Sequence, residues 1–307
     1  MIRFITYLII LTLGTLTSSA QLKTEEILIK NGEIELPGTL TFIEEKTPLI
    51  IWIHGSGPVD RNGNQPAQNV KANYIKQFRD SINKENIAFF SYDKRTANKN
   101  NSKLLAHTKI TDFTLDAEKV ITHFKNENRF SKIILVGHSQ GSLIAMMAAK
   151  EVDQYISIAG SGEQIDETII KQITKNNAPL GLAARKQFDT LRVKGKIETV
   201  HPFLMSIFGK PNQAFLYDWM QLNPKIEIKK LKIPVLIING DKDLQVTIED
   251  AKILHAANTN SKLVIIENMN HVLKDIQKEE DNIKSYYSSE YQISNKLIKT
   301  ISLFIKK

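Results

Sequence analysis

Continuous apolar runs alternate with amphipathic segments along most of the chain. The strand-like runs are Pro48–Ile53, Ile87–Tyr92, Lys132–Val136, Tyr155–Ala159, Ile233–Asn239 and Lys262–Glu267. Runs that are apolar on both faces are what a buried parallel sheet requires. Their alternation with helical segments predicts a doubly wound, mostly parallel α/β sheet.

Helical periodicity fills the intervals between these runs. One segment places Tyr74, Phe78 and Ile82 on a single face, a second extends from Phe113 to Phe124, and a third covers Leu143–Ala149. Residues three and four apart share a face of an α-helix, so each segment has an apolar side that can pack on the sheet.

An antiparallel hairpin is predicted ahead of the parallel strands. Glu26–Lys30 and Glu33–Ile43 have strand character and are joined at Asn31-Gly32. Asn-Gly suits a two-residue turn because both central positions need a positive φ.

The interval between Ala159 and Ile233 contains no convincing strand. Ile165–Ile173, Leu182–Val193 and Gln213–Leu222 are helical in pattern. A structureless loop of this length is improbable inside a compact domain. We therefore expect a helical lid insertion at about residues 161–230, covering the ligand-binding end of the sheet.

The first twenty residues have the order of a secretory signal. Arg3 precedes a mostly apolar stretch, Phe4–Leu16, and Ser18-Ser19-Ala20 places small residues before Gln21. We expect cleavage after residue 20, a mature domain at residues 21–307, and export to the periplasm or the cell exterior. The apolar stretch is shorter than the ~20 residues that span a bilayer, so no stable membrane anchor is expected after cleavage. An uncleaved anchor or a buried first strand is the alternative.

Composition narrows the chemistry. The 307 residues include no Cys, which excludes disulfides, thiolate metal sites and a cysteine nucleophile. The net charge of +8 is spread along the chain. No nucleic-acid partner is expected, because no basic tail is present. A solvated basic surface is the simple interpretation, and a polyanion-binding envelope protein is an alternative.

Gly137-His138-Ser139-Gln140-Gly141 matches the pattern G-x-S-x-G. A strand-like run precedes it and a helical segment follows it. A sharp turn of this kind requires small residues two before and two after the serine, and it exposes the serine oxygen at a helix N-terminus. Ser139 is therefore the candidate nucleophile, against the alternative of a passive serine in a Gly-rich turn.

A serine nucleophile needs a base and an acid that orients it. His271 follows the last strand-like run, where the chain order Ser, Asp, His places the base. Asp241 and Asp243 both follow the preceding run. We favour Asp243 as the acid, and expect Asp241 to shape the turn by accepting backbone hydrogen bonds.

Two backbone amides are expected to form the oxyanion hole. One is the N–H of Gln140, directly after the nucleophile. The second should come from His54–Pro58, with Ser56 favoured over Gly57. A phosphate-binding turn is a weaker interpretation, because Pro58 removes a donor and no phosphate-loop pattern follows.

These motifs resemble the serine esterases of the α/β-hydrolase superfamily, in the bacterial branch whose oxyanion loop has the sequence HGSGP. The matching stretches are His54–Pro58, Asp60–Gly63, Tyr92–Arg95, Gly137–Gly141, Gly240–Val246 and Asn270–Lys274. The resemblance extends from about Ile34 to Lys274. It departs from the family at Thr96–Lys99, where relatives commonly have Gly and a small-residue turn. It implies an α/β-hydrolase fold and carboxylesterase activity through Ser139, Asp243 and His271, without a metal or cofactor.

We therefore expect a serine hydrolase that cleaves small-molecule carboxylic esters through an acyl-enzyme. Candidate pocket residues in the insertion are Met205, Phe208, Phe215 and Trp219; they would equally serve as the insertion's own core. A peptidase or thioesterase on the same triad and a catalytically silent binding protein are the alternatives. The sequence makes no prediction of oligomeric state.

Overall fold

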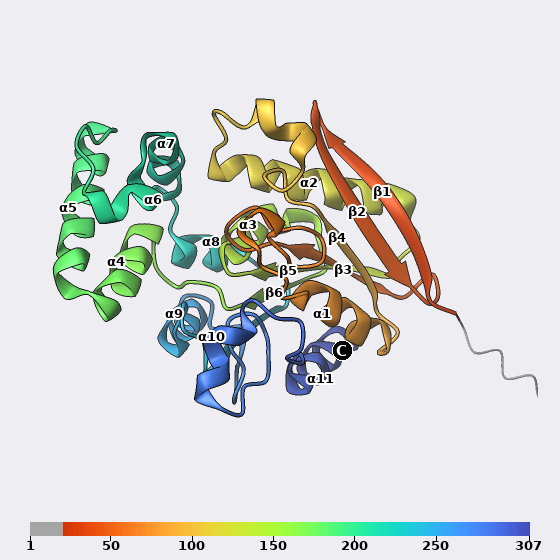
Figure 1. Cartoon of the computed structure of the whole chain (residues 1–307). Coiled ribbons are helices and arrows are strands. Elements are labelled where there is room, and N and C mark those ends of the chain that lie inside the picture. Colours follow the sequence, from red (N-terminus) through yellow and green to blue (C-terminus); the bar gives the residue numbers. More distant parts are fainter. Residues whose placement is uncertain (1–20) are drawn as a thin grey trace, which may run out of the picture.

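The computed structural model describes residues 21–307, so the predicted signal peptide lies outside the described part of the chain. Within it, eight strands form one sheet in the order β1-β2-β4-β3-β5-β6-β7-β8 (Figure 1). The strands are β1 (Lys23–Asn31), β2 (Ile34–Phe42), β3 (Pro48–Ile53), β4 (Ala88–Tyr92), β5 (Lys132–His138), β6 (Gln154–Ile158), β7 (Val235–Gly240) and β8 (Lys262–Ile266). All pairings from β4 to β8 are parallel. The predicted α/β-hydrolase fold is confirmed.

The N-terminal hairpin forms as the Asn-Gly pattern predicts. Strands β1 and β2 pair antiparallel from Lys23 opposite Phe42 to Asn31 opposite Ile34. Gly32 has a φ of +61° in the turn, a conformation that glycine adopts without strain. Strand β2 then pairs antiparallel with β4, which joins the hairpin to the parallel part of the sheet.

Eleven α-helices accompany the strands in residues 21–307. They are α1 (Tyr74–Asn83), α2 (Ile110–Glu127), α3 (Gln140–Ala148), α4 (Ile165–Asn176), α5 (Ala178–Lys194), α6 (Met205–Phe208), α7 (Lys210–Trp219), α8 (Pro224–Lys230), α9 (Ile248–Ala257), α10 (Asn282–Ser285) and α11 (Asn295–Ile305). None of the helices in the described chain is both long and apolar enough to cross a bilayer.

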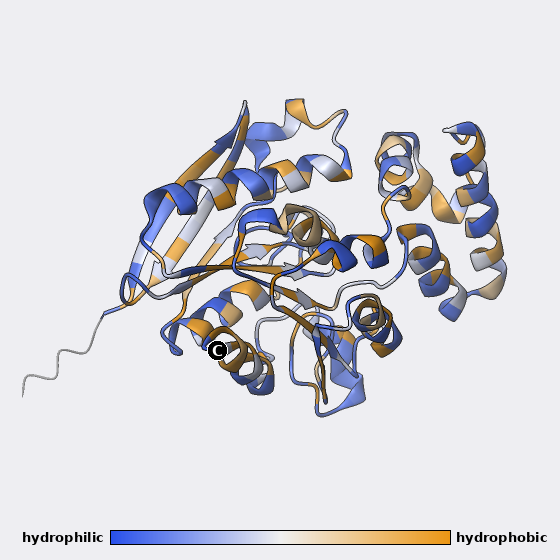
Figure 2. Cartoon of the chain, turned by 180° about the vertical axis from the view of Figure 1, so that it is seen from behind, coloured by the Kyte–Doolittle hydropathy of each residue, from blue (hydrophilic) through white to orange (hydrophobic). Residues whose placement is uncertain are grey.

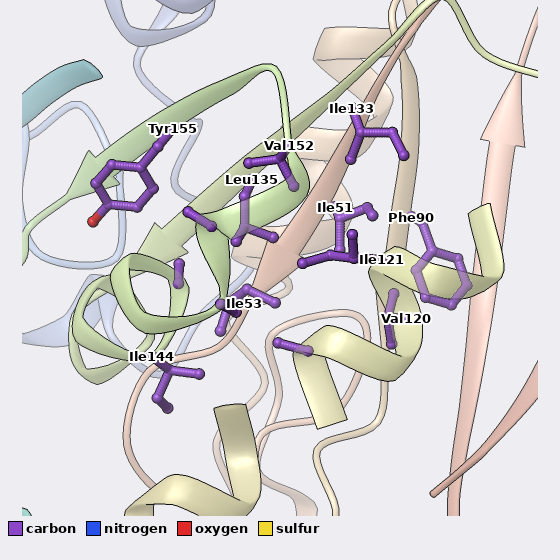
Figure 3. Packing of buried hydrophobic residues seen from close by; sticks show 14 of the residues in the cluster. Ile51, Ile53, Phe90, Val120, Ile121, Ile133, Leu135, Ile144, Val152 and Tyr155 are labelled. Atoms are coloured by element: carbon purple, nitrogen blue, oxygen red, sulfur yellow. The ribbon is translucent and has the colours of Figure 1, made fainter. Parts of the chain in front are cut away.

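The sheet has a buried core on each face. Along β3, Leu49, Ile51 and Ile53 face one core, while Ile50 and Trp52 face the other. Helices α2, α3, α8 and α9 cover the first face, and Figure 3 shows side chains of α2 and α3 packing there against β3, β4 and β5. Helices α1 and α11 cover the second face. Two-sided burial explains why these strands are continuously apolar, whereas the covering helices alternate hydrophobic and hydrophilic residues (Figure 2).

Helices α4 to α8 occupy the interval between β6 and β7. Figure 1 shows α4 to α7 as a group projecting away from the hairpin side of the sheet. The group has its own core, in which the rings of Phe188 and Phe208 lie 4.6 Å apart between centroids. Ile228 of α8 is buried in the main core, so α8 leads the chain back to the sheet.

Five of the helices match none of the predicted helical segments, namely α6 and α8 in the insertion and α9, α10 and α11 after it. Two of those after the insertion carry a local signal. Thr247 and Asp250 form a capping box at the start of α9. In α11, Leu297, Ile298, Ile301 and Ile305 are buried along one face.

A buried ion pair ties the hairpin, the loop after β4 and α2 together. Arg95 donates from Nε to Asp116 Oδ2 at 2.7 Å and from one terminal nitrogen to Oδ1 at 2.8 Å. Asn31 Nδ2 donates to the same Oδ1 at 2.9 Å. Asp116 is 1% exposed and Arg95 is 5% exposed. Removing one partner would leave the other charge buried without compensation.

We predict that Asp116→Ala lowers the free energy of unfolding by about 3 kcal/mol. Glu151→Ala is the control, because Glu151 pairs with Lys125 on the surface and such pairs contribute only about 0–1 kcal/mol. Urea unfolding followed by circular dichroism measures both variants. Equal, small losses would contradict a structural role for the buried pair.

Candidate active site

A strained turn between β5 and α3 holds Ser139. Its backbone has φ +54° and ψ −122°, an unfavourable region for a residue with a Cβ. A Cβ on Gly137 would lie 2.4 Å from the Gly141 carbonyl oxygen, and one on Gly141 would lie 2.2 Å from that of Ile53. Glycine is therefore required at both positions, in agreement with the spacing of the motif.

Asp243 and His271 form a hydrogen-bonded pair at the carboxyl edge of the sheet. The loop after β7 carries Asp243, whose Oδ2 lies 2.8 Å from His271 Nδ1. Its Oδ1 accepts from the backbone N–H groups of Gln245 at 2.7 Å and Val246 at 2.9 Å, which fixes the carboxylate. Asp241 instead accepts from the N–H of Asn268 at 2.6 Å. Of the two candidate acids, Asp243 is thus the one that contacts the imidazole.

Ser139 and His271 line one cavity of about 360 Å³. No hydrogen bond joins Ser139 Oγ to the His271 ring among the described residues. Such contacts are often long without substrate and tighten when it binds. The Oγ atom is therefore available to a ligand in the cavity.

His138 lies in the G-x-S-x-G motif and connects the turn at Ser139 to the loop that carries His271. Its Nε2 donates to the backbone carbonyl of His271 at 2.8 Å, and its Nδ1 lies 3.4 Å from the Tyr74 hydroxyl. Burial lowers the pKa of His138 to about 3, so the ring is neutral at ordinary pH. This role of His138 could not be predicted from the sequence, since its partner is a backbone carbonyl that no motif identifies.

The two candidate oxyanion residues lie beside the nucleophile. Ser56, in the loop after β3, lines the cavity of Ser139 and a second cavity of about 230 Å³. Gln140 is the first residue of α3 and lines the second cavity together with Ser139. The first N–H groups of a helix have no partner within the helix, so this position suits an anion.

The second cavity lies between the nucleophile turn and the helical insertion. Its apolar lining comes from Leu143, Ile165, Ile169, Trp219, Pro224 and Val246. Of these residues, Trp219 was predicted from the sequence, and the aliphatic ones were not. These aliphatic residues differ from other apolar residues only in lying near Ser139 in the fold, and the sequence does not reveal that distance.

Three other candidate pocket residues lie elsewhere. Phe208 is fully buried in the insertion's own core. Phe215 packs edge-on against Phe113 and Trp219, and Met205 is 54% exposed. None of the three lines either cavity at Ser139. The expectation that they line the pocket is corrected. Phe208 packs inside the insertion, whereas Phe215 packs against Phe113 of α2.

The model of the BD-FAE family matches residues 40–257, more than half of the chain. The chain belongs to the BD-FAE family. Esterase EstD of Thermotoga maritima is 26% identical over 294 residues, covering 92% of this chain and 68% of the relative.

Solved structures show the same fold. Est1E from Butyrivibrio proteoclasticus has a TM-score of 0.57 at 17% identity, covering 92% of this chain and 99% of the other. The Pyrococcus furiosus esterase PF2001 has a TM-score of 0.60 at 17% identity, covering 96% and 95%. The predicted resemblance to α/β-hydrolase esterases is confirmed by these comparisons, and so is the assignment to the carboxylesterase type of hydrolase.

No cluster of three or more His, Asp or Glu side chains within residues 21–307 is placed to hold a metal ion.

The buried, neutral state of His138 predicts a dependence of stability on pH. The unfolded state takes up a proton as pH falls below 6.5, whereas the folded state excludes it until about pH 3. Between pH 6.5 and 5 the wild-type chain should therefore lose about 1.5 kcal/mol more unfolding free energy than His138→Gln. Urea unfolding at several pH values provides the measurement.

His107→Gln is the control for this comparison, because His107 is exposed. It should keep the wild-type dependence on pH. Parallel curves for the wild type and His138→Gln would show that His138 is not held neutral.

Proposed function

We propose that the chain cleaves carboxylic esters through a Ser139–His271–Asp243 triad with an acyl-enzyme intermediate. The observation that carries the proposal is the Asp243–His271 hydrogen bond, formed on the wall of the cavity into which the strained turn presents Ser139. Family membership and the esterase relatives independently favour ester substrates.

The first half of the reaction forms the acyl-enzyme. His271 Nε2 removes the proton of Ser139 while Oγ attacks the ester carbonyl, and the N–H groups of Ser56 and Gln140 stabilise the oxyanion. Asp243 accepts from Nδ1–H of His271, which fixes the tautomer and stabilises the imidazolium. His271 then protonates the leaving alcohol.

The second half releases the acid. Water donates its proton to His271 and attacks the acyl carbonyl. As the resulting intermediate collapses, His271 returns the proton to Ser139 Oγ, which releases the carboxylic acid. The same two N–H groups serve both halves, because the oxyanion forms in the same place each time.

The two cavities suggest how the halves of an ester are distributed. Both are lined by Ser56, Ser139 and Gln245, so they meet at the nucleophile. We assign the acyl group to the cavity under the insertion, which offers Leu143, Ile165 and Trp219. The alcohol then occupies the cavity beside His271. In this assignment the insertion acts as a lid over the acyl side.

A peptidase or thioesterase on the same triad is the second candidate function. It would use the same Asp243–His271 pair, and peptide and thioester substrates separate it from an esterase. A silent binding protein is disfavoured, because Ser139 and His271 line one cavity and Asp243 is hydrogen-bonded to His271.

We predict that Asp243→Asn lowers kcat/KM for p-nitrophenyl esters by about 10⁴-fold, because an amide stabilises the wrong imidazole tautomer. Ser139→Ala should remove turnover. Initial rates over a series of acyl lengths provide the measurement and also report the size of the acyl cavity.

Asp241→Asn is the matched control. Asp241 lies two residues from Asp243, and its carboxylate accepts a hydrogen bond from the backbone N–H of Asn268. Its kcat/KM should stay within a few-fold of wild type. Equal losses at both positions would contradict the assignment of Asp243 as the orienting acid.

We also propose export of the chain, on the strength of the charged start and short apolar stretch of residues 1–20. Expression of the full gene in a bacterium should yield an exported product whose N-terminus is Gln21. Recovery of the uncut chain in the cytoplasm would contradict this proposal.

A further inference from the structure

The buried ammonium group of Lys94 joins the two segments that carry the oxyanion donors. Lys94 follows β4 and is 4% exposed. Its Nζ donates to the Gly55 carbonyl oxygen at 2.7 Å and to Gln140 Oε1 at 2.6 Å. The Phe113 ring lies against it, with the centroid 4.5 Å from Nζ.

The bond to Gly55 acts on the peptide unit that contains the Ser56 N–H. No peptide bond in the described chain is cis, and in a trans peptide the C=O and N–H point in opposite directions. A cation that holds the Gly55 oxygen therefore directs the Ser56 N–H away from Lys94. It also polarises the peptide, which makes that N–H a stronger donor.

The bond to Gln140 acts on the other donor residue. Gln140 begins α3 and is 7% exposed. Because Oε1 is held by the same ammonium, the first residue of α3 and the loop after β3 are kept at a fixed separation. The two N–H groups must converge on one oxygen atom, so their relative position matters more than either position alone.

A structural role alone does not account for a lysine here. No carboxylate within residues 21–307 forms a salt bridge with Lys94, and Asp116, the acidic group that acts on it electrostatically, is bonded to Arg95. Burial lowers the pKa of Lys94 to about 7. A buried cation without a carboxylate partner is costly to keep, and such residues concentrate at functional sites.

We propose that Lys94 is a positioning residue that holds the Ser56 and Gln140 amides together as one oxyanion hole. The proposal rests on the ester-cleaving function above. Lys94 does not touch the substrate. It acts through the Gly55 carbonyl and the Gln140 side chain.

Kinetics of Lys94→Met provide the first test. We expect kcat to fall about 10- to 100-fold while KM stays within about threefold, because an oxyanion hole contacts the transition state more strongly than the substrate. Inhibition by an alkyl boronic acid, whose adduct with the serine places an oxygen in that hole, should weaken by a similar factor. Gln140→Met should show part of the same loss.

Asn83→Leu is the control for a merely structural effect. Asn83 is likewise buried and donates to the backbone carbonyls of Thr41 and Ile87, on the α1 side of the sheet. It should lower the melting temperature without changing kcat or boronate affinity. If Lys94→Met behaves in the same way, the proposal is wrong.

The absence of Cys from the chain allows a sharper test that does not depend on Lys94→Met folding well. Lys94→Cys carries a single thiol, which can be alkylated in denaturant with 2-bromoethylamine or 1-bromopropane and the protein refolded. Each reaction forms a C–S bond and releases bromide. The two products have side chains of nearly equal length, and one of them ends in an ammonium group.

The aminoethylated protein should recover kcat and boronate affinity to within a few-fold of refolded wild type, and the propylated protein should not. Equal activity of the two products would overturn the proposal. If refolded wild type itself cleaves no ester and binds no boronate, the proposed function has failed instead, and the two failures are thereby distinguished.

Discussion

The strained conformation of Ser139 is the constraint on which the site depends. A positive φ at a residue with a side chain persists only where the surrounding structure enforces it. Here β5 is paired on both sides. Gly137 lets α3 approach β5 closely, and Gly141 lets α3 approach the backbone of β3. The sheet thereby fixes the serine oxygen at the start of α3, where helix dipole and free N–H groups favour developing negative charge.

The remaining groups reach Ser139 because parallel strands end at one edge of the sheet. The loops after β3, β4, β7 and β8 supply Ser56, Lys94, Asp243 and His271. Polar contacts between loops then set their relative positions. His138 bonds to the His271 backbone, and Lys94 bonds to both Gly55 and Gln140. The carboxyl edge of the sheet therefore brings the loops together, and a few buried hydrogen bonds fix their relative positions.

The strands, the hairpin and the turn at Ser139 could be predicted because each has a signal within a few residues. These signals are a continuous apolar run for a strand, Asn-Gly for the hairpin and G-x-S-x-G for the turn. The sequence also led to Asp243 and His271, whose positions follow from chain order. It could not identify the role of His138 or Lys94, since both bind groups distant in sequence. The residues that line the pocket could not be predicted for the same reason. Phe208 lies in a core and Leu143 lines a cavity, but the neighbouring sequence does not distinguish the two situations. Helices α9 and α11 had capping and amphipathic signals that were overlooked.

We expect the strained turn to present Ser139 as an activated nucleophile. Covalent labelling with a fluorophosphonate, followed by peptide mass spectrometry, tests it most directly. The account predicts one adduct, located on Ser139, with labelling much slower in His271→Ala. Absence of an adduct under conditions that label a known serine esterase, or an adduct on another serine such as Ser56 or Ser161, would contradict it.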